Sequence, residues 1–175
     1  GIIPLSSNEW KDHISFVVFF NGCPFNCSYC HNHKMLTDIN YVTTKTIKNS
    51  IKNSLPFINS VVFSGGEPTA QPEPLEDLLR YAKSLNLKTM IETNGYFPEV
   101  LKKLANNNLI DEIYIDIKTT KEDYAKLTRK DDAYKKMIES INISVPIVKR
   151  TTVFKNISVP KCSNILQRGL VSLSK

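Results

Sequence analysis

The chain has 175 residues, of which 41% are hydrophobic and 23% charged, as expected for a globular protein with one core. No apolar run approaches the ~18 residues of a membrane span, and residues 1–10 lack the pattern of a secretory signal, so we expect one cytoplasmic domain, residues 1–175, without a membrane partner. The net charge of +6 arises from residues 88–175, where basic and acidic residues are interspersed; this favours solvated helix faces, and no nucleic-acid partner is expected.

Five short apolar segments are predicted to be β-strands. They are Ile14–Phe20, Val61–Ser64, Thr89–Thr93, Glu112–Lys118 and Ile147–Phe154. Each is a nearly continuous hydrophobic run, which is typical of parallel strands that are buried on both faces.

Amphipathic helices are predicted between these strands. They are Thr44–Leu55, Pro74–Leu85, Pro98–Asn106, and Asp123–Ser140 in one or two pieces. Such alternation of strand and helix predicts an α/β fold of βαβ units around a parallel sheet, although the pattern alone does not separate an open sheet from a barrel. Residues 157–175 fit neither a full helix nor a clear strand.

Three of the four cysteines, Cys23, Cys27 and Cys30, fall within eight residues directly after the first predicted strand. They therefore leave the carboxyl end of a parallel strand, where α/β folds place their ligand sites. Their Cys-x3-Cys-x2-Cys spacing can supply thiolates to three irons of a cubane, whereas four cysteines would close such a cluster. The spacing thus favours an iron–sulfur site with one iron left open for another ligand.

Other interpretations of this loop are weaker. Cys27-x-x-Cys30-His31 also matches a c-type haem attachment pattern, but that pattern leaves Cys23 without a role. A zinc site that adds His31 or His33 to the cysteines is chemically feasible. Inert buried cysteines are disfavoured, because a loop rich in Asn, Ser, His and Gly does not bury three thiols.

Polar residues also follow the later strands. Gly65 and Gly66 at the end of the second strand indicate, by themselves, only a tight turn or a close backbone approach. Asp116 and Lys118 point to the same side of the fourth strand. Burying this pair is costly without a ligand or a partner, so either an internal salt bridge or a ligand site is expected. Arg150, in the fifth strand, suits a carboxylate contact or a surface role.

The string Phe19-Phe20-Asn21-Gly22-Cys23 through Cys30-His31-Asn32, with Tyr29 before the third cysteine, resembles the signature of the radical S-adenosylmethionine (SAM) superfamily. It is most similar to the activating enzymes of glycyl-radical enzymes, in particular those of anaerobic ribonucleoside-triphosphate reductase. The resemblance extends from about Trp10 to about Val153, and Ser64-Gly65-Gly66-Glu67-Pro68 resembles the GGEP motif of the superfamily. No match to the family's sixth strand follows Asn156, so residues 156–175 are expected to form an atypical tail with Cys162 as an ordinary thiol.

This resemblance implies a partial (β/α)6 TIM-like barrel without its last strand, and a [4Fe–4S] cluster on Cys23, Cys27 and Cys30. It also implies that SAM chelates the open iron, is cleaved reductively to a 5′-deoxyadenosyl radical, and so abstracts a hydrogen atom from a glycine of a partner. The partner is expected to be the large subunit of a glycyl-radical enzyme, with anaerobic ribonucleotide reductase as the first candidate, and the electron donor a flavodoxin or ferredoxin.

The resemblance further assigns roles to residues around SAM. The residues implied in SAM binding are Tyr29, His31, Gly65, Gly66, Glu67, Thr93, Asn94, Asp116, Lys118 and Arg150. Within this set, Gly66 brings its backbone close to SAM and Glu67 meets the ammonium group. A monovalent cation is expected on Glu92, Thr93 and Asp116, although the family has Asp where this chain has Glu92.

Two other functions remain open from the sequence. One is a radical SAM enzyme with a small-molecule substrate, such as a deazapurine-forming synthase, which shares the GGEP motif. The Cys30-His31-Asn32 run favours the activating enzymes over this class. The other is a non-catalytic iron–sulfur protein.

Overall fold

The computed structural model describes residues 1–28, 30, 41–147, 150–155 and 170–174, and from residue 147 onward it describes the backbone alone. The strands are β1 (Ile2–Ser6), β2 (Ser15–Phe20), β3 (Ser60–Gly65), β4 (Lys88–Thr93), β5 (Glu112–Ile117), β6 (Arg150–Lys155) and β7 (Leu170–Ser174). The helices are α2 (Thr44–Ser54), α3 (Pro72–Ser84), α4 (Pro98–Asn106), α5 (Lys121–Thr128) and α6 (Ala133–Ile147), with a short 3-10 helix η1 (Pro68–Ala70).

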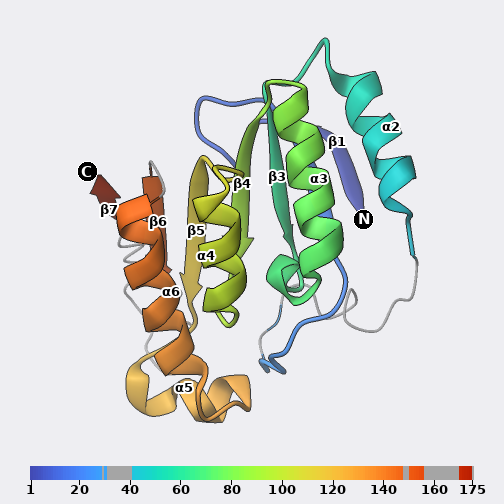
Figure 1. Cartoon of the computed structure of the whole chain (residues 1–175). Helices are drawn as coiled ribbons and strands as arrows, with labels where there is room; N and C mark the ends of the chain where they lie inside the picture. The colour runs from blue at the N-terminus through green and yellow to red at the C-terminus, as the bar shows by residue number, and fades with distance from the viewer. Residues whose placement is uncertain (29, 31–40, 148–149, 156–169, 175) are drawn as a thin grey trace.

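The strands form one sheet in the order β1-β2-β3-β4-β5-β6-β7. Strands β2 to β6 are parallel, whereas β1 pairs antiparallel with β2 and β7 pairs antiparallel with β6. Helices α2, α3, α4 and α6 lie on one side of this sheet (Figure 1). The predicted α/β fold with a partial, TIM-like parallel sheet is confirmed, and β1 and β7 are the sheet's two edges within the described chain.

The structure corrects two predictions near the C-terminus. Ile147, predicted to begin a strand, is the last residue of α6, and the strand β6 begins at Arg150. The segment 157–175, predicted to contain no clear strand, includes β7. Among the described residues the edge beside β6 is therefore occupied by an antiparallel strand, where a (β/α)6 barrel would have a sixth parallel one.

Successive residues of the parallel strands point to opposite faces of the sheet, and both faces are apolar. The helix-covered face carries the larger core cluster, with strand residues Phe16, Val18, Phe20, Val61, Phe63, Ile91, Ile113 and Ile115. The opposite face carries a smaller cluster of Trp10, Val17, Val62 and Met90. This two-sided burial is the physical reason that the strands are continuous apolar runs.

Two helices end in the same way and so return the chain to the sheet. Asn86 after α3 and Asn108 after α4 adopt the left-handed conformation, with φ of 59° and 54°. The next residues, Leu87 and Leu109, donate backbone hydrogen bonds to Ala82 and Leu104 at 3.1 Å, and both leucines are buried. This is the Schellman arrangement, in which a left-handed residue closes a helix and a following apolar side chain packs back against it.

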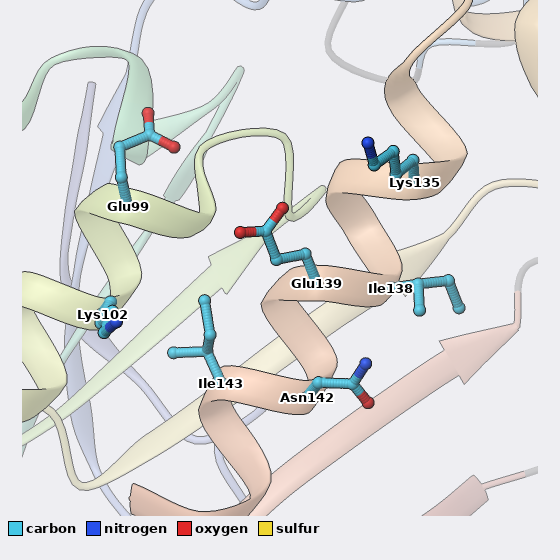
Figure 2. Close-up of a pocket in the computed structure, with 7 residues that line it drawn as sticks. All are labelled: Glu99, Lys102, Lys135, Ile138, Glu139, Asn142 and Ile143. Carbon is cyan, nitrogen blue, oxygen red and sulfur yellow. The ribbon is translucent and has the colours of Figure 1, made fainter.

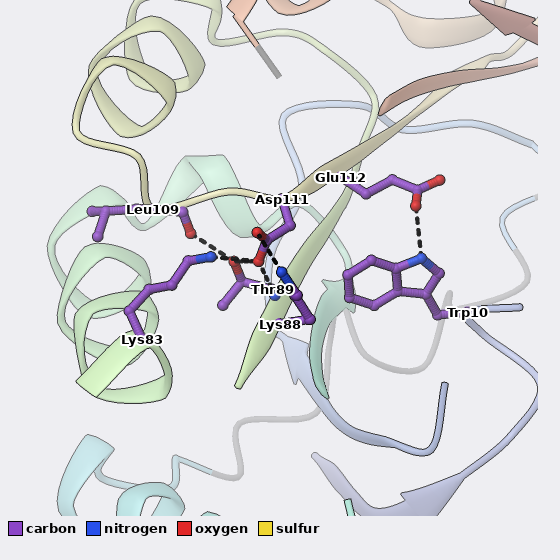
Figure 3. Close-up of polar contacts among 7 residues, drawn as sticks. All are labelled: Trp10, Lys83, Lys88, Thr89, Leu109, Asp111 and Glu112. Atoms are coloured by element: carbon purple, nitrogen blue, oxygen red, sulfur yellow. Dashed lines mark hydrogen bonds and ion pairs between the residues drawn. The ribbon is translucent and has the colours of Figure 1, made fainter. Parts of the chain in front are cut away.

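The amino-terminal ends of β4 and β5 are fastened by a polar network (Figure 3). The carboxylate of Asp111 accepts hydrogen bonds from the Thr89 backbone at 2.9 Å and from the Lys83 ammonium group. Beside it, the indole of Trp10 donates to the carboxylate of Glu112 at 2.6 Å in a buried contact. These groups lie at the strand ends opposite to the cysteine loop. No helix in the described part of the chain has the length and apolar character needed to cross a bilayer.

Candidate active site at the carboxyl ends of the strands

The cysteine loop leaves β2 and is anchored to other elements through its backbone. The carbonyl of Asn21 accepts a hydrogen bond from the Gln71 side chain at 2.7 Å, and the Asn26 amide donates to the Thr128 carbonyl at 3.3 Å. Phe25 is buried, and its ring meets the ring of Tyr96 edge-on, with 5.3 Å between the centroids. Elements distant in sequence therefore fix the loop between its cysteines.

All three cysteines of the loop are free thiols. Cys27 is buried, whereas Cys23 and Cys30 are half-buried, and the Cys30 amide donates to the Cys27 carbonyl at 3.2 Å. Burial raises the pKa of Cys23 to about 11 and also raises the pKa of Cys27, while the charge of Lys118 acts in the opposite direction on both. Without a metal, the thiols of Cys23 and Cys27 are protonated at neutral pH, so a metal must displace their protons on binding.

The three thiols of the loop are the type of ligand that an iron–sulfur cluster requires. Among the described residues, no three His, Cys, Asp or Glu side chains converge closely enough to hold a single metal ion. A four-iron cubane separates its cysteine ligands more widely than one ion does, and it is bound through thiolates alone. Three free thiols on one anchored loop supply the ligands that such a cluster needs, whereas the zinc alternative adds His31 or His33, which lie outside the described residues.

The two glycines at the end of β3 allow the end of β2 and the cysteine loop to lie close to the β3 backbone. A Cβ atom on Gly65 would lie 2.4 Å from the backbone N and O of Phe20, and one on Gly66 would lie 2.1 Å from the carbonyl oxygen of Gly22. The same contact carries two hydrogen bonds, from Gly66 N to Phe20 O at 2.8 Å and from Glu67 N to Gly22 O at 2.9 Å. The glycines thus join the loop to β3, and their predicted contact with SAM remains a prediction.

Glu67 connects the ends of β3 and β4. Its side chain is fully buried, and its carboxylate accepts hydrogen bonds from Thr69 N at 3.0 Å, Thr93 Oγ1 at 2.7 Å and Asn94 N at 2.8 Å, as well as from the Thr69 hydroxyl. Burial raises the pKa of Glu67, and these hydrogen bonds oppose the rise. Both carboxylate oxygens of Glu67 therefore accept hydrogen bonds from the protein, and the expected contact with the SAM ammonium group remains a prediction.

Thr93 and Asn94 follow β4 and reach the cysteine loop. The Thr93 hydroxyl bridges Glu67 and the Gly95 amide, which donates to it at 3.0 Å. Asn94 is 4% exposed, and its side-chain Nδ2 lies 3.5 Å from the sulfur of Cys23 as a hydrogen-bond donor. This amide-to-sulfur contact joins the β4 loop to a predicted cluster ligand.

Asp116 and Lys118 form the internal ion pair that the sequence allowed. Lys118 Nζ lies 2.6 Å from Asp116 Oδ2, with both side chains partly exposed. Burial lowers the pKa of Lys118, but the Asp116 carboxylate outweighs it, so the net pKa is raised. Asp116 Oδ1, in contrast, is buried and has no hydrogen-bond partner among the described residues.

Glu92 lies on the same face of the sheet as Asp116 and senses its charge. Burial raises the pKa of Glu92, the charges of Glu9 and Asp116 raise it further, and a hydrogen bond from Ser64 opposes the rise. Ser64 Oγ donates to Glu92 Oε2 at 2.5 Å. Ser64 was quoted in the GGEP-like motif but was not among the predicted site residues, although its position at the end of β3, two residues after Val62, places it on this face.

Three predicted site residues lie wholly or partly outside the described part of the chain. Tyr29 and His31 lie outside the described residues. The backbone of Arg150 pairs with Glu112 in the parallel register of β5 and β6, and its side chain lies outside the description. Arg150 begins β6 and therefore lies at the amino-terminal end of the sheet, away from the other members. The remaining described members of the predicted set lie at the carboxyl ends of β2, β3, β4 and β5.

A separate pocket lies on the helical side of the molecule, between α4 and α6 (Figure 2). Its lining residues are Glu99, Lys102, Lys135, Ile138, Glu139, Asn142 and Ile143. Charges of both signs surround it, and none of the predicted site residues lines it. The candidate site is therefore at the strand ends and not in this pocket.

Comparison with known proteins agrees with this assignment. Residues 17–157 match the radical SAM superfamily. An inferred glycyl-radical enzyme activating enzyme of Methanocaldococcus jannaschii is 35% identical over 155 residues, covering 88% of this chain and 64% of that protein. The pyruvate formate-lyase-activating enzyme of Clostridium pasteurianum is 31% identical over 172 residues, covering 88% of this chain and 70% of that enzyme. The chain thus spans about two thirds of the length of these relatives.

Solved structures support the fold. Native anSMEcpe with bound AdoMet and the Kp18Cys peptide has a TM-score of 0.63 at 19% identity, over 79% of this chain and 42% of that one. TYW1 with a lysine-pyruvate adduct has a TM-score of 0.56 at 16% identity, over 80% of this chain and 53% of that one.

Proposed function

Because the chain belongs to the radical SAM superfamily, and within it to the glycyl-radical enzyme activating enzymes, we propose that it is a radical SAM activase. In this proposal residues 1–175 form one radical SAM domain that binds a [4Fe–4S] cluster and SAM. The product is a glycyl radical on a partner enzyme.

The observation that carries the proposal is that the loops after β2, β3 and β4 meet at the carboxyl ends of these strands. The Glu67 amide donates to the carbonyl of Gly22 in the cysteine loop at 2.9 Å, and the Gly66 amide donates to the carbonyl of Phe20, the last residue of β2, at 2.8 Å. The cysteine loop contacts the loop after β4 through Asn94 and Cys23 at 3.5 Å. Ligands of parallel α/β folds bind at the carboxyl ends of the strands, so the residues for the cluster and for SAM would be neighbours there.

The residues at these strand ends have separate roles in the proposal. Cys23, Cys27 and Cys30 would hold three irons, and Lys118 would offset the negative charge that their thiolates add. When bound, the cluster supplies the electron that splits the SAM sulfonium into methionine and a 5′-deoxyadenosyl radical. The anchored loop and the buried side chains around it would exclude water from the reacting groups.

We extend the proposal to SAM and a monovalent cation. The unpartnered, buried Asp116 Oδ1 and the neighbouring Glu92 carboxylate are oxygen donors that suit a hard cation. Thr93 has a weaker claim, because its hydroxyl already bridges Glu67 and Gly95. Lys118 is the nearby cation for a SAM carboxylate, in exchange for part of its contact with Asp116.

The partner and electron donor are further elements of the proposal. Anaerobic ribonucleotide reductase is the candidate that the sequence motifs suggest, and pyruvate formate-lyase is the one that the name of the Clostridium pasteurianum relative suggests. A flavodoxin or ferredoxin would deliver the electron. A cytoplasmic location is also proposed, since free thiols persist where cysteines are kept reduced.

The test begins with anaerobic reconstitution of the chain with iron and sulfide. Reduced protein should convert SAM to 5′-deoxyadenosine slowly when alone, measured by liquid chromatography with mass spectrometry. Addition of the cognate partner should give the EPR doublet of a glycyl radical, and the two candidate partners are compared side by side. Rapid multiple turnover of a small metabolite, with no doublet on either partner, would refute the activase assignment in favour of a small-molecule enzyme.

The cysteine assignment has a matched control. Cys23→Ala, Cys27→Ala and Cys30→Ala should each abolish the cluster absorbance and SAM cleavage, because three ligands are the minimum for this site. Cys162→Ala, at a position outside the described residues, should leave the cluster spectrum unchanged. Full iron content and activity in Cys27→Ala would show that the ligand set is wrong.

A further inference from the structure

The side-chain amide of Asn94 donates a hydrogen bond to the sulfur of Cys23, one of the proposed cluster ligands. We propose that Asn94 donates to the Cys23 sulfur in the cluster-loaded protein and raises the reduction potential of the cluster, and that Glu67 is the positioning residue that holds Asn94 there. This inference rests on the proposed [4Fe–4S] site. It assigns to Glu67 and Asn94 a task that is separate from contact with SAM.

The orientation of the Asn94 amide follows from its other partner. Its Oδ1 accepts a hydrogen bond from the backbone N–H of Tyr96 at 3.0 Å. An oxygen must occupy that position, so the NH2 end faces Cys23, where Nδ2 lies 3.5 Å from the sulfur. Because Asn94 is only 4% exposed, little solvent competes for this contact.

The backbone of Asn94 is held by Glu67. The Asn94 amide donates to Glu67 Oε2 at 2.8 Å, while Glu67 Oε1 is occupied by Thr69 and Thr93. Because the carboxylate is fully buried and has donors on both oxygens, it has little freedom to move. A continuous chain of hydrogen bonds therefore runs from Glu67 through Asn94 to the sulfur of Cys23.

A hydrogen bond to a cluster sulfur affects the two redox states unequally. The reduced cluster carries one more negative charge, so an N–H donor stabilises it more than the oxidised cluster. Loss of the Asn94 donor should therefore make reduction harder. The expected effect is about a tenfold decrease in the ratio of reduced to oxidised cluster at a given potential, equivalent to 59 mV for one electron.

The test is a potentiometric titration of the reconstituted full chain without SAM or partner, with the reduced cluster followed by EPR. Asn94→Leu removes the donor and should shift the midpoint to more negative potential by about the 59 mV expected for a tenfold change. Asn94→Asp keeps an oxygen for Tyr96 but replaces the donor, and should shift the midpoint in the same direction. Ser140→Ala is the control, since Ser140 bonds the Gly95 carbonyl of the same loop at 2.7 Å without touching sulfur.

The role of Glu67 is tested with Glu67→Gln. If its carbonyl keeps Thr69 and Thr93 as donors, its NH2 group faces the Asn94 N–H, donor against donor, and moves Asn94 from the sulfur. The midpoint should then lie between those of wild type and Asn94→Leu. A merely structural role would lower the unfolding temperature and leave the potential unchanged.

The possible results separate this inference from the proposed function. If wild-type protein takes up no [4Fe–4S] cluster, both fail. If wild-type protein takes up the cluster and cleaves SAM, but the cluster has the same midpoint potential in Asn94→Leu and Asn94→Asp as in wild type, the tuning role alone is overturned. Loss of the cluster from both variants, with native circular dichroism, would also overturn it by assigning Asn94 to cluster assembly.

Discussion

Replacing Gly66 by Ala should displace the cysteine loop, because the required space is filled by main chain. The new Cβ would lie 2.1 Å from the carbonyl oxygen and 2.8 Å from the carbonyl carbon of Gly22. Contacts below 3.0 Å are essentially never seen for real Cβ atoms, so the two segments must separate by roughly 0.9 Å. No side-chain rotation can relieve a collision between two backbones.

The magnitude follows from the hydrogen bonds at this crossing. Separation by that distance would stretch Gly66 N to Phe20 O, now 2.8 Å, and Glu67 N to Gly22 O, now 2.9 Å, beyond useful length. Two backbone hydrogen bonds contribute about 1 kcal/mol each, and partly buried groups left without partners add to the loss. We expect a decrease of about 2–4 kcal/mol in the free energy of unfolding, together with poor cluster assembly.

The assay combines urea unfolding of the metal-free protein, followed by circular dichroism, with iron and sulfide analysis after reconstitution. Gly22→Ala is the matched control on the other side of the contact. Gly22 has φ of +81°, and a Cβ atom added to it would meet no atom within 4 Å, so only backbone strain of about 1–2 kcal/mol is expected. A Gly66→Ala protein with wild-type stability and iron content would refute the reasoning.

Three further predictions concern carboxylates and their partners. Asp116→Asn should weaken SAM binding, measured by equilibrium dialysis, more than it reduces iron content, because a neutral amide cannot balance the proposed cation; wild-type SAM affinity and cleavage rate would exclude that role. Asp111→Asn should lower stability by about 1–3 kcal/mol at neutral pH, since Lys83 and the Thr89 amide bond the carboxylate. Although burial acts to raise it, the net pKa of Asp111 is lowered by those contacts, so the stabilisation is full above the unfolded pKa of about 3.9 and is lost as pH falls through the folded value. Urea titrations at pH 7 and pH 3 should therefore show a difference between wild type and variant that shrinks on acidification, and a constant difference would contradict the assignment. Trp10→Phe should cost about 1–3 kcal/mol in thermal unfolding followed by circular dichroism, because it removes the buried indole donor to Glu112, and an unchanged unfolding free energy would contradict this.

Local sequence predicted the central strands well because their burial is continuous and two-sided. It failed where a contact with another part of the fold decides the local structure. The β-branched residues from Ile147 onward favour a strand, yet α6 continues to Ile147, with buried Ser144 donating to the Ser140 carbonyl and Ser140 to the Gly95 carbonyl. Edge strand β1 was not predicted, since its short apolar run is interrupted by Pro4 and its residues are mostly exposed.

The cysteine spacing, the strand and helix periodicity, and the motif resemblance were determined by the sequence itself, because each depends on residues close together in the chain. The roles of Gly66, Glu67 and Asn94 were decided only by the tertiary structure. Gly66 has to be small because Gly22, 44 residues earlier, occupies the space of its Cβ, and Glu67 is buried because β4 brings donors to it. Contacts between separate strand ends depend on how the sheet assembles, and no local pattern of residue types records them.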